Sequence, residues 1–243
     1  AVERRMTVTQ TTGKSFSKVS LTGANKAGEV ITKARQRDAA ILREQVKAFA
    51  ARRERVFLAA SKAVREALGD VEAMTGHFGA LRGVNAYEAC LAAIVLGREQ
   101  PAPAAIEDIA RCFAVAREER LLTVDSYVTC TRRRRMRDPN AVSVETVEVH
   151  PDPLAQAILE QVREAECVQT LDRVRGIFND REGWVLNALV IDVTIDCVSS
   201  WKAVRQGWRG GSRWTEALHR GRDAGVMPLS YGELSRLWPD LWA

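Results

Sequence analysis

Two long stretches of the sequence place apolar residues at helical spacing, and they restrict the fold more than any other feature. Between residues 35 and 68, apolar side chains recur every three or four positions, and residues 154–174 repeat the pattern. This spacing gathers them on one face of an amphipathic helix. Glycine ends helices well, so we expect the first helix to end at Gly69 and the second near Gly176. The sequence thus predicts two long helices as its main packing elements.

Two shorter helices are predicted between the long ones. Asn85 can cap the first, with Glu88 three residues later completing a capping box, and Gly97 is placed to end it. Pro101 and Pro103 are placed to open the second, because proline is well tolerated in the first helical turn.

A β-hairpin is predicted after these helices. Residues 121–131 and 141–149 are rich in Val, Thr and Tyr, and the turn-forming pair Pro139-Asn140 lies between them. The resulting fold class is mainly α: a helical core with one Arg-tipped β-hairpin and a Trp-rich C-terminal helical module. The last sixty residues hold all six tryptophans, namely Trp184, Trp201, Trp208, Trp214, Trp238 and Trp242.

Four segments are expected along the chain. Residues 1–34 contain few bulky apolar side chains and are interpreted as a basic N-terminal arm. Residues 35–120 form a helical domain, 121–150 the hairpin, and 151–243 the C-terminal helical module. The terminal pair Trp238 and Trp242 fits either a core or a subunit interface.

The charge distribution favours anionic partners. Lys and Arg number 36 against 31 Asp and Glu, for a net charge of +5. Residues 2–55 alone hold thirteen cations and five acids, a larger surplus than that of the whole chain. Arginine exceeds lysine 29 to 7, and guanidinium suits phosphate and carboxylate. A GC-rich genome would give the same ratio without any function.

The strongest candidate site is an arginine cluster at the predicted hairpin tip. Five guanidinium groups within six residues repel one another and attract polyanions, which suits a nucleic-acid backbone. The alternatives are a solvated loop without a partner and a contact with an acidic protein. The cluster consists of Arg132, Arg133, Arg134, Arg135 and Arg137.

A second candidate lies near the C-terminus. Ser199 or Ser200 can cap a short helix that ends at Gly207, and Ser212 can cap another. Ala203 lies four residues before Gly207, as a small residue does in the helix-turn-helix motif. The segment resembles helix-turn-helix DNA-binding proteins over about 25 residues, although its turn is roughly two residues longer. The resemblance implies that the second helix reads bases, and a helical hairpin without DNA is the alternative. The nucleic-acid contacts expected here are Arg209, Arg213, Arg220 and Arg222.

Other functional classes find little support in the sequence. The common hydrolase, metalloprotease and nucleotide-binding motifs are missing, so no catalytic residue is predicted. The five cysteines form no CxxC pair and lie near no histidine in sequence, so we expect free thiols and neither a metal nor a cofactor. No stretch has the length and apolar character of a membrane span, and a cytoplasmic protein is expected.

The sequence therefore predicts a nucleic-acid-binding protein, with DNA favoured. The leading interpretation is a bacterial or phage transcriptional regulator that forms a homo-oligomer, with the transcription machinery as a further partner. The alternative is a structural nucleoprotein, such as a viral coat or packaging protein in a virion. Its N-terminal arm would reach a neighbouring subunit, and its arginines would neutralise packaged nucleic acid.

Overall fold

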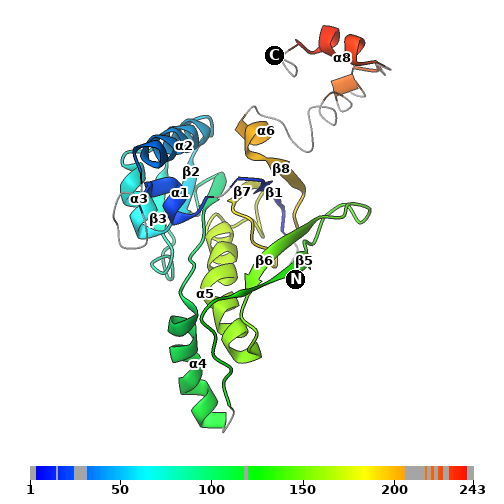
Figure 1. The fold of residues 1–243 in the computed structure, drawn as a ribbon. Coiled ribbons are helices and arrows are strands. Elements are labelled where there is room, and N and C mark those ends of the chain that lie inside the picture. Colours follow the sequence, from blue (N-terminus) through cyan, green and yellow to red (C-terminus); the bar gives the residue numbers. More distant parts are fainter. Residues whose placement is uncertain are drawn as a thin grey trace.

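The computed structural model describes residues 4–14, 16–24, 32–117, 120–205, 217, 220–221, 224–226 and 230–239 (Figure 1). Its strands are β1 (Met6–Thr12), β2 (Val56–Ala60), β3 (Met74–His77), β4 (Ala92–Leu96), β5 (Val128–Arg133), β6 (Val144–Val149), β7 (Arg181–Leu186) and β8 (Cys197–Ser200). Its helices are α1 (Lys18–Thr22), α2 (Lys33–Ala51), α3 (Lys62–Leu68), α4 (Pro103–Arg117), α5 (Pro153–Asp172), α6 (Trp201–Arg205) and α8 (Tyr231–Leu237).

A six-stranded sheet forms the centre of the fold. Its order is β3-β2-β4-β7-β1-β8, and every neighbouring pair is parallel. The prediction of a mainly α, all-helical protein is therefore wrong, because the chain is mixed α/β. The error has a physical cause: a short apolar run buried on both faces of a sheet carries no alternating pattern.

Strands β2 and β4 show this most clearly. Their sequences, Val-Phe-Leu-Ala-Ala and Ala-Ala-Ile-Val-Leu, are apolar throughout, and every one of their residues is buried. The helix expected over residues 35–68 is interrupted at β2, since α2 ends at Ala51 and Arg55 adopts a positive φ of 48°. The helix expected to end at Gly97 is instead strand β4.

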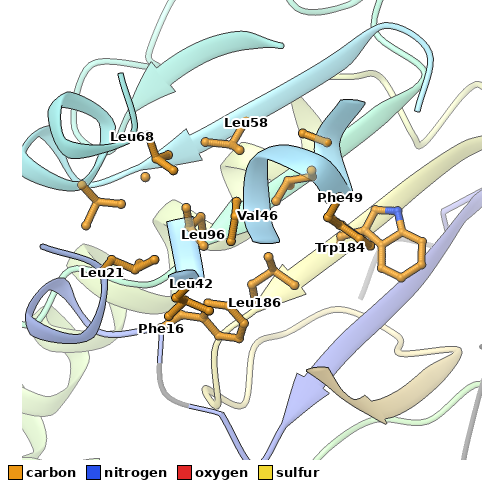
Figure 2. Close-up of a cluster of buried hydrophobic side chains, with 14 of the residues drawn as sticks. Phe16, Leu21, Leu42, Val46, Phe49, Leu58, Leu68, Leu96, Trp184 and Leu186 are labelled. Carbon is orange, nitrogen blue, oxygen red and sulfur yellow. The ribbon is translucent and has the colours of Figure 1, made fainter. Parts of the chain in front are cut away.

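One face of the sheet is covered by α1, α2 and α3 (Figure 1). Figure 2 shows how Leu42, Val46 and Phe49 of α2 pack onto Leu96 and Leu186 of the sheet. The predicted amphipathic face of α2 is therefore real, although the helix is shorter than expected. Each fully buried side chain of this size contributes roughly 1.5–3 kcal/mol.

The opposite face of the sheet is covered mainly by α5 and by connecting loops. Cys167 and Leu171 of α5 pack against Met6, Val8 and other strand residues. The helix predicted over residues 154–174 is confirmed as α5, and the helix predicted after Pro101 is confirmed as α4. Helix α4 packs against α5 away from the sheet (Figure 1).

The beginning of the chain is part of the sheet. Residues 6–12, expected within a basic arm, form β1 between β7 and β8. Val8 is fully buried and Met6 is 1% exposed. This strand was missed because Thr and Gln alternate with its few apolar residues.

The predicted hairpin exists as the antiparallel pair β5–β6. The predicted cap of the short helix that follows Ser200, α6, also exists, since the Ser200 hydroxyl accepts a hydrogen bond from the Ala203 N–H at 3.2 Å. Among the described residues, two tryptophans belong to the sheet's core: Trp184 lies in β7, and Trp201 of α6 contacts Phe49 at a ring distance of 5.4 Å.

Candidate functional site

The arginine cluster is largely paired with carboxylates. Arg132 contacts Glu160 at 2.6 Å, Arg135 contacts Asp192 at 3.1 Å, and Arg137 pairs with Asp196. The structure places the cluster at the end of β5 and in the segment that follows it. Met136 in this segment bridges to Ile195 in the loop between β7 and β8.

Arg134 is the most enclosed member of the cluster, with a side chain only 1% exposed. Its guanidinium donates to Gln10 Oε1 of β1 at 2.8 Å, to Ser143 Oγ at 2.9 Å and to Glu145 Oε2 at 2.6 Å. These bonds attach the hairpin to the central sheet. Arg134 therefore has a structural role that uses its whole donor fork.

A cavity of about 560 Å³ runs beside the cluster. Arg132 to Arg135 line it, but so do Asp138, Glu160, Glu164 and Asp192. Four cations facing four acids give a groove with little net charge. Arg133 is exposed and forms no ion pair with any residue that the structure describes. It is the one member of the cluster that keeps the character expected of a phosphate contact.

The helix-turn-helix prediction concerns residues that lie mostly outside the described ranges. Arg209, Arg213 and Arg222 fall there, so their expected base contacts stay a prediction. Arg220 is described, and its carbonyl accepts a hydrogen bond from the Ala224 N–H at 2.9 Å.

The structure brings together a second set of cations, which the sequence alone does not reveal. A lysine or arginine stands two residues after the end of four strands: Lys14 after β1, Lys62 after β2, Arg98 after β4 and Lys202 after β8. All six strands are parallel, so these residues meet at one edge of the sheet, the carboxyl edge. Ligands of open parallel sheets bind at this edge.

Lysines dominate the exposed part of the carboxyl edge. We call Lys14, Lys18, Lys62 and Lys202 the edge lysines; all four are exposed, and none forms an ion pair with a described residue. Neighbouring strands lie about 4.8 Å apart, so six strands span roughly 24 Å. The edge lysines therefore give this side of the molecule an extended positive surface.

Beside the lysines, a smaller cavity of about 290 Å³ lies at the ends of β1, β4 and β7. It is lined by Gly13, Lys14, Phe16, Ser17, Gly97, Arg98, Glu145, Asn187 and Ala188. Burial lowers the pKa of the Arg98 guanidinium, and the nearby positive charge of Arg163 lowers it further. The nearby carboxylates of Glu148 and Glu164 oppose this shift, so burial is its main cause.

No family model matches this chain. No curated protein and no solved structure matches it either. The candidate site is therefore described only from the residues and contacts of this structure.

A buried acid–base cluster lies where α4 meets the start of α5. His150 Nε2 lies 3.1 Å from Glu107 Oε1, while His150 Nδ1 accepts a hydrogen bond from the Asp152 N–H. Glu107 also accepts from the Val124 N–H, and this bond lowers the pKa of its carboxyl. The side chains of this cluster accept hydrogen bonds from backbone N–H groups, and these bonds join α4, the start of α5 and the segment before β5.

Neither a metal site nor a membrane helix is found in the residues that the structure describes. No group of three or more His, Cys, Asp or Glu side chains is arranged there to hold a metal ion. None of the helices in those ranges has the length and apolar character needed to cross a membrane.

Proposed function

We propose that the chain binds nucleic acid and that the phosphate backbone lies along the carboxyl edge of the sheet. The observation that supports the proposal is the row of edge lysines, which form no ion pair with a described residue, although the Glu99 carboxylate interacts electrostatically with Lys18. Lysine ammonium groups neutralise backbone phosphates without reading sequence. The surplus of cations in residues 2–55 supports the same partner.

The edge replaces the arginine cluster as the main phosphate-binding surface in this proposal. Arg132, Arg134, Arg135 and Arg137 are engaged with carboxylates, and releasing those ion pairs would cost part of the binding energy. Arg133 alone remains available beside them. A strand that follows the edge meets ammonium groups that form no ion pair with a described residue.

The test uses two triple variants that remove equal charge. The edge variant is Lys18→Gln, Lys62→Gln and Lys202→Gln. The control variant is Arg5→Gln, Arg55→Gln and Arg175→Gln, which changes exposed arginines away from the carboxyl edge; each is paired with one carboxylate, that of Asp180, Glu54 or Glu88. Two of these, Arg5 and Arg55, directly precede β1 and β2.

Binding is measured by fluorescence anisotropy with labelled single-stranded DNA, duplex DNA and RNA between 50 and 200 mM salt. We expect the edge variant to bind more weakly. Its salt slope on duplex DNA should be shallower by up to roughly 0.9 for each phosphate that the variant no longer neutralises. The control variant should bind like wild type. Equal losses in both variants, or no binding by the wild type, would contradict the proposal.

The same samples distinguish the two kinds of nucleic-acid-binding protein. A regulator is expected to prefer one selected duplex and to remain a small oligomer in light scattering. A structural nucleoprotein is expected to show little preference and to assemble to high mass when nucleic acid is added.

A further inference from the structure

The 290 Å³ cavity lies where ligands are expected in parallel α/β proteins. The chain leaves β1 toward the face covered by α1 and α2, but it leaves the neighbouring strand β7 toward the face covered by α5. Adjacent strands whose connections diverge in this way leave a crevice between their carboxyl ends. Lys14 lines the crevice from the β1 side, and Asn187 lines it from the β7 side.

The walls of this cavity are held in place by close backbone contacts. Gly97 has a φ of +73°, and a Cβ built there would lie 2.5 Å from the Phe16 carbonyl oxygen. Only glycine allows the loop after β1 to pass this close to the end of β4. Asn187 Nδ2 donates to the Gly97 carbonyl at 2.8 Å, which fixes the β7 side to the same point. The cavity is therefore formed before any ligand arrives.

The charges around the cavity leave a positive surplus. Glu145 on its wall is bound by Arg134 at 2.6 Å, and the Arg98 guanidinium is bound to Glu148 at 2.8 Å. Each acid is thus matched by an arginine. Lys14 remains, with no ion pair to a described residue. A ligand that brings one or two negative charges would balance it.

We propose that this cavity binds the phosphate group of a small phosphate ester, with Lys14 as its cationic contact and the Glu148-bound Arg98 in the wall beside it. Its volume is near the lower limit of ligand pockets, about 300 Å³. That size suits a phosphate with one sugar ring and excludes a large cofactor. The ester is a sugar phosphate or a mononucleotide, since both present the same phosphate and ring. This site does not depend on nucleic-acid binding, which is tested at the other three edge lysines, Lys18, Lys62 and Lys202.

The experiment is isothermal titration of the full chain with three probes: inorganic phosphate, ribose 5-phosphate and AMP. Lys14→Gln is the test variant, and Lys18→Gln, four residues along the chain, is the matched control. A charge-assisted contact is worth about ten- to a hundred-fold in affinity, so Lys14→Gln should weaken ester binding by that factor. Lys18→Gln should leave ester binding unchanged. Tighter binding of AMP than of ribose 5-phosphate identifies the nucleotide, and equal binding identifies the sugar phosphate.

Three results would overturn the proposal: no binding of either ester, equal affinity in the Lys14 and Lys18 variants, or inorganic phosphate binding as tightly as the esters. Protection from acetylation provides a second measurement on wild-type protein. Saturating ester should shield the Lys14 amine but leave Lys62 reactive. The two proposals fail separately, because the edge variant with Lys18, Lys62 and Lys202 replaced should lose nucleic acid while still binding the ester.

Discussion

The Arg134 guanidinium donates a 2.8 Å hydrogen bond to the Gln10 side chain, and both residues are buried. This bond joins the β5–β6 hairpin to β1, across 124 positions of sequence. Gln10 in turn donates to the Asn187 and Leu189 carbonyls, at 3.0 and 2.6 Å. The hairpin, β1 and the loop after β7 are therefore tied together by one polar network.

Loss of Arg134 is expected to destabilise the protein. Arg134→Ala leaves Glu145 and Gln10 without their shared donor, and removing one partner of a buried pair costs about 3 kcal/mol or more. Arg133→Ala, at the neighbouring exposed position, should stay within about 0.5 kcal/mol of wild type. The free energy of unfolding in urea checks both values. Equal stability of the two variants would contradict the structural role.

Acid should remove part of the stability through Asp152 and Glu107. Burial raises the pKa of Asp152, but the backbone N–H groups of Leu122, Ala155 and Leu154 lower it more, and the pKa of Glu107 is also lowered. A carboxyl whose pKa is lower in the folded protein than in the unfolded one stabilises the fold at pH values above the unfolded pKa, which is about 4 for these groups. This stabilisation is lost as the pH falls from the unfolded pKa through the folded pKa. Urea unfolding from pH 7 to pH 3 should show this loss.

The double variant Asp152→Asn and Glu107→Gln serves as the control for this pH dependence. It should be less stable at pH 7, and its stability should fall less steeply below pH 4. Parallel curves for the variant and wild type would assign the acid sensitivity to other carboxylates.

The cysteines should react with iodoacetamide in a fixed order. Cys112 is exposed and should be modified first. Burial raises the pKa of Cys167 to about 12, and it also raises the pKa of Cys90. Because the thiolate is the reactive form, both should stay protected at pH 8 until the protein unfolds. Peptide mass spectrometry over time measures the order, and early modification of Cys167 would contradict the described core.

Removal of residues 1–12 is expected to abolish cooperative unfolding. The deletion takes away β1, which separates β7 from β8 inside the sheet. If the segment were only an arm, the melting temperature would be unchanged. Circular dichroism during heating distinguishes the two outcomes.

Gly97→Ala should cost more stability than Gly79→Ala. Both glycines have a positive φ, +73° and +81°, so both substitutions carry the penalty of about 1–2 kcal/mol for a side chain in that conformation. Only at Gly97 does the new Cβ also meet a backbone atom, the Phe16 oxygen. The difference in unfolding free energy between the two variants measures the closeness of that approach.

The sequence predicts amphipathic elements of this fold well and buried strands poorly. Helix α5 repeats its apolar face over five turns, so its period is evident, whereas β2 and β4 are five residues long and wholly apolar. Val56 to Ala60 continued the helical spacing of α2 by coincidence. Only the turn around Arg55, with its positive φ, separates the two elements.

The candidate site was harder to predict than the fold. A cluster such as Arg132 to Arg135 attracts notice in a sequence, yet its acidic partners Glu160 and Asp192 lie far along the chain. Single lysines such as Lys62 do not stand out in the sequence. Their common position two residues after a strand becomes visible only once the strands are known.

The pairing of β1 also sets the order of events during synthesis. Met6 of β1 pairs with Arg181 of β7, which the ribosome adds 175 residues later. At about 5–20 residues per second, β1 waits roughly 10 to 35 s for its neighbour. Throughout that interval its buried residues have no sheet to join. The nascent chain must therefore stay unassembled at its centre, and a translational pause before β7 would lengthen its exposure to aggregation and to chaperones.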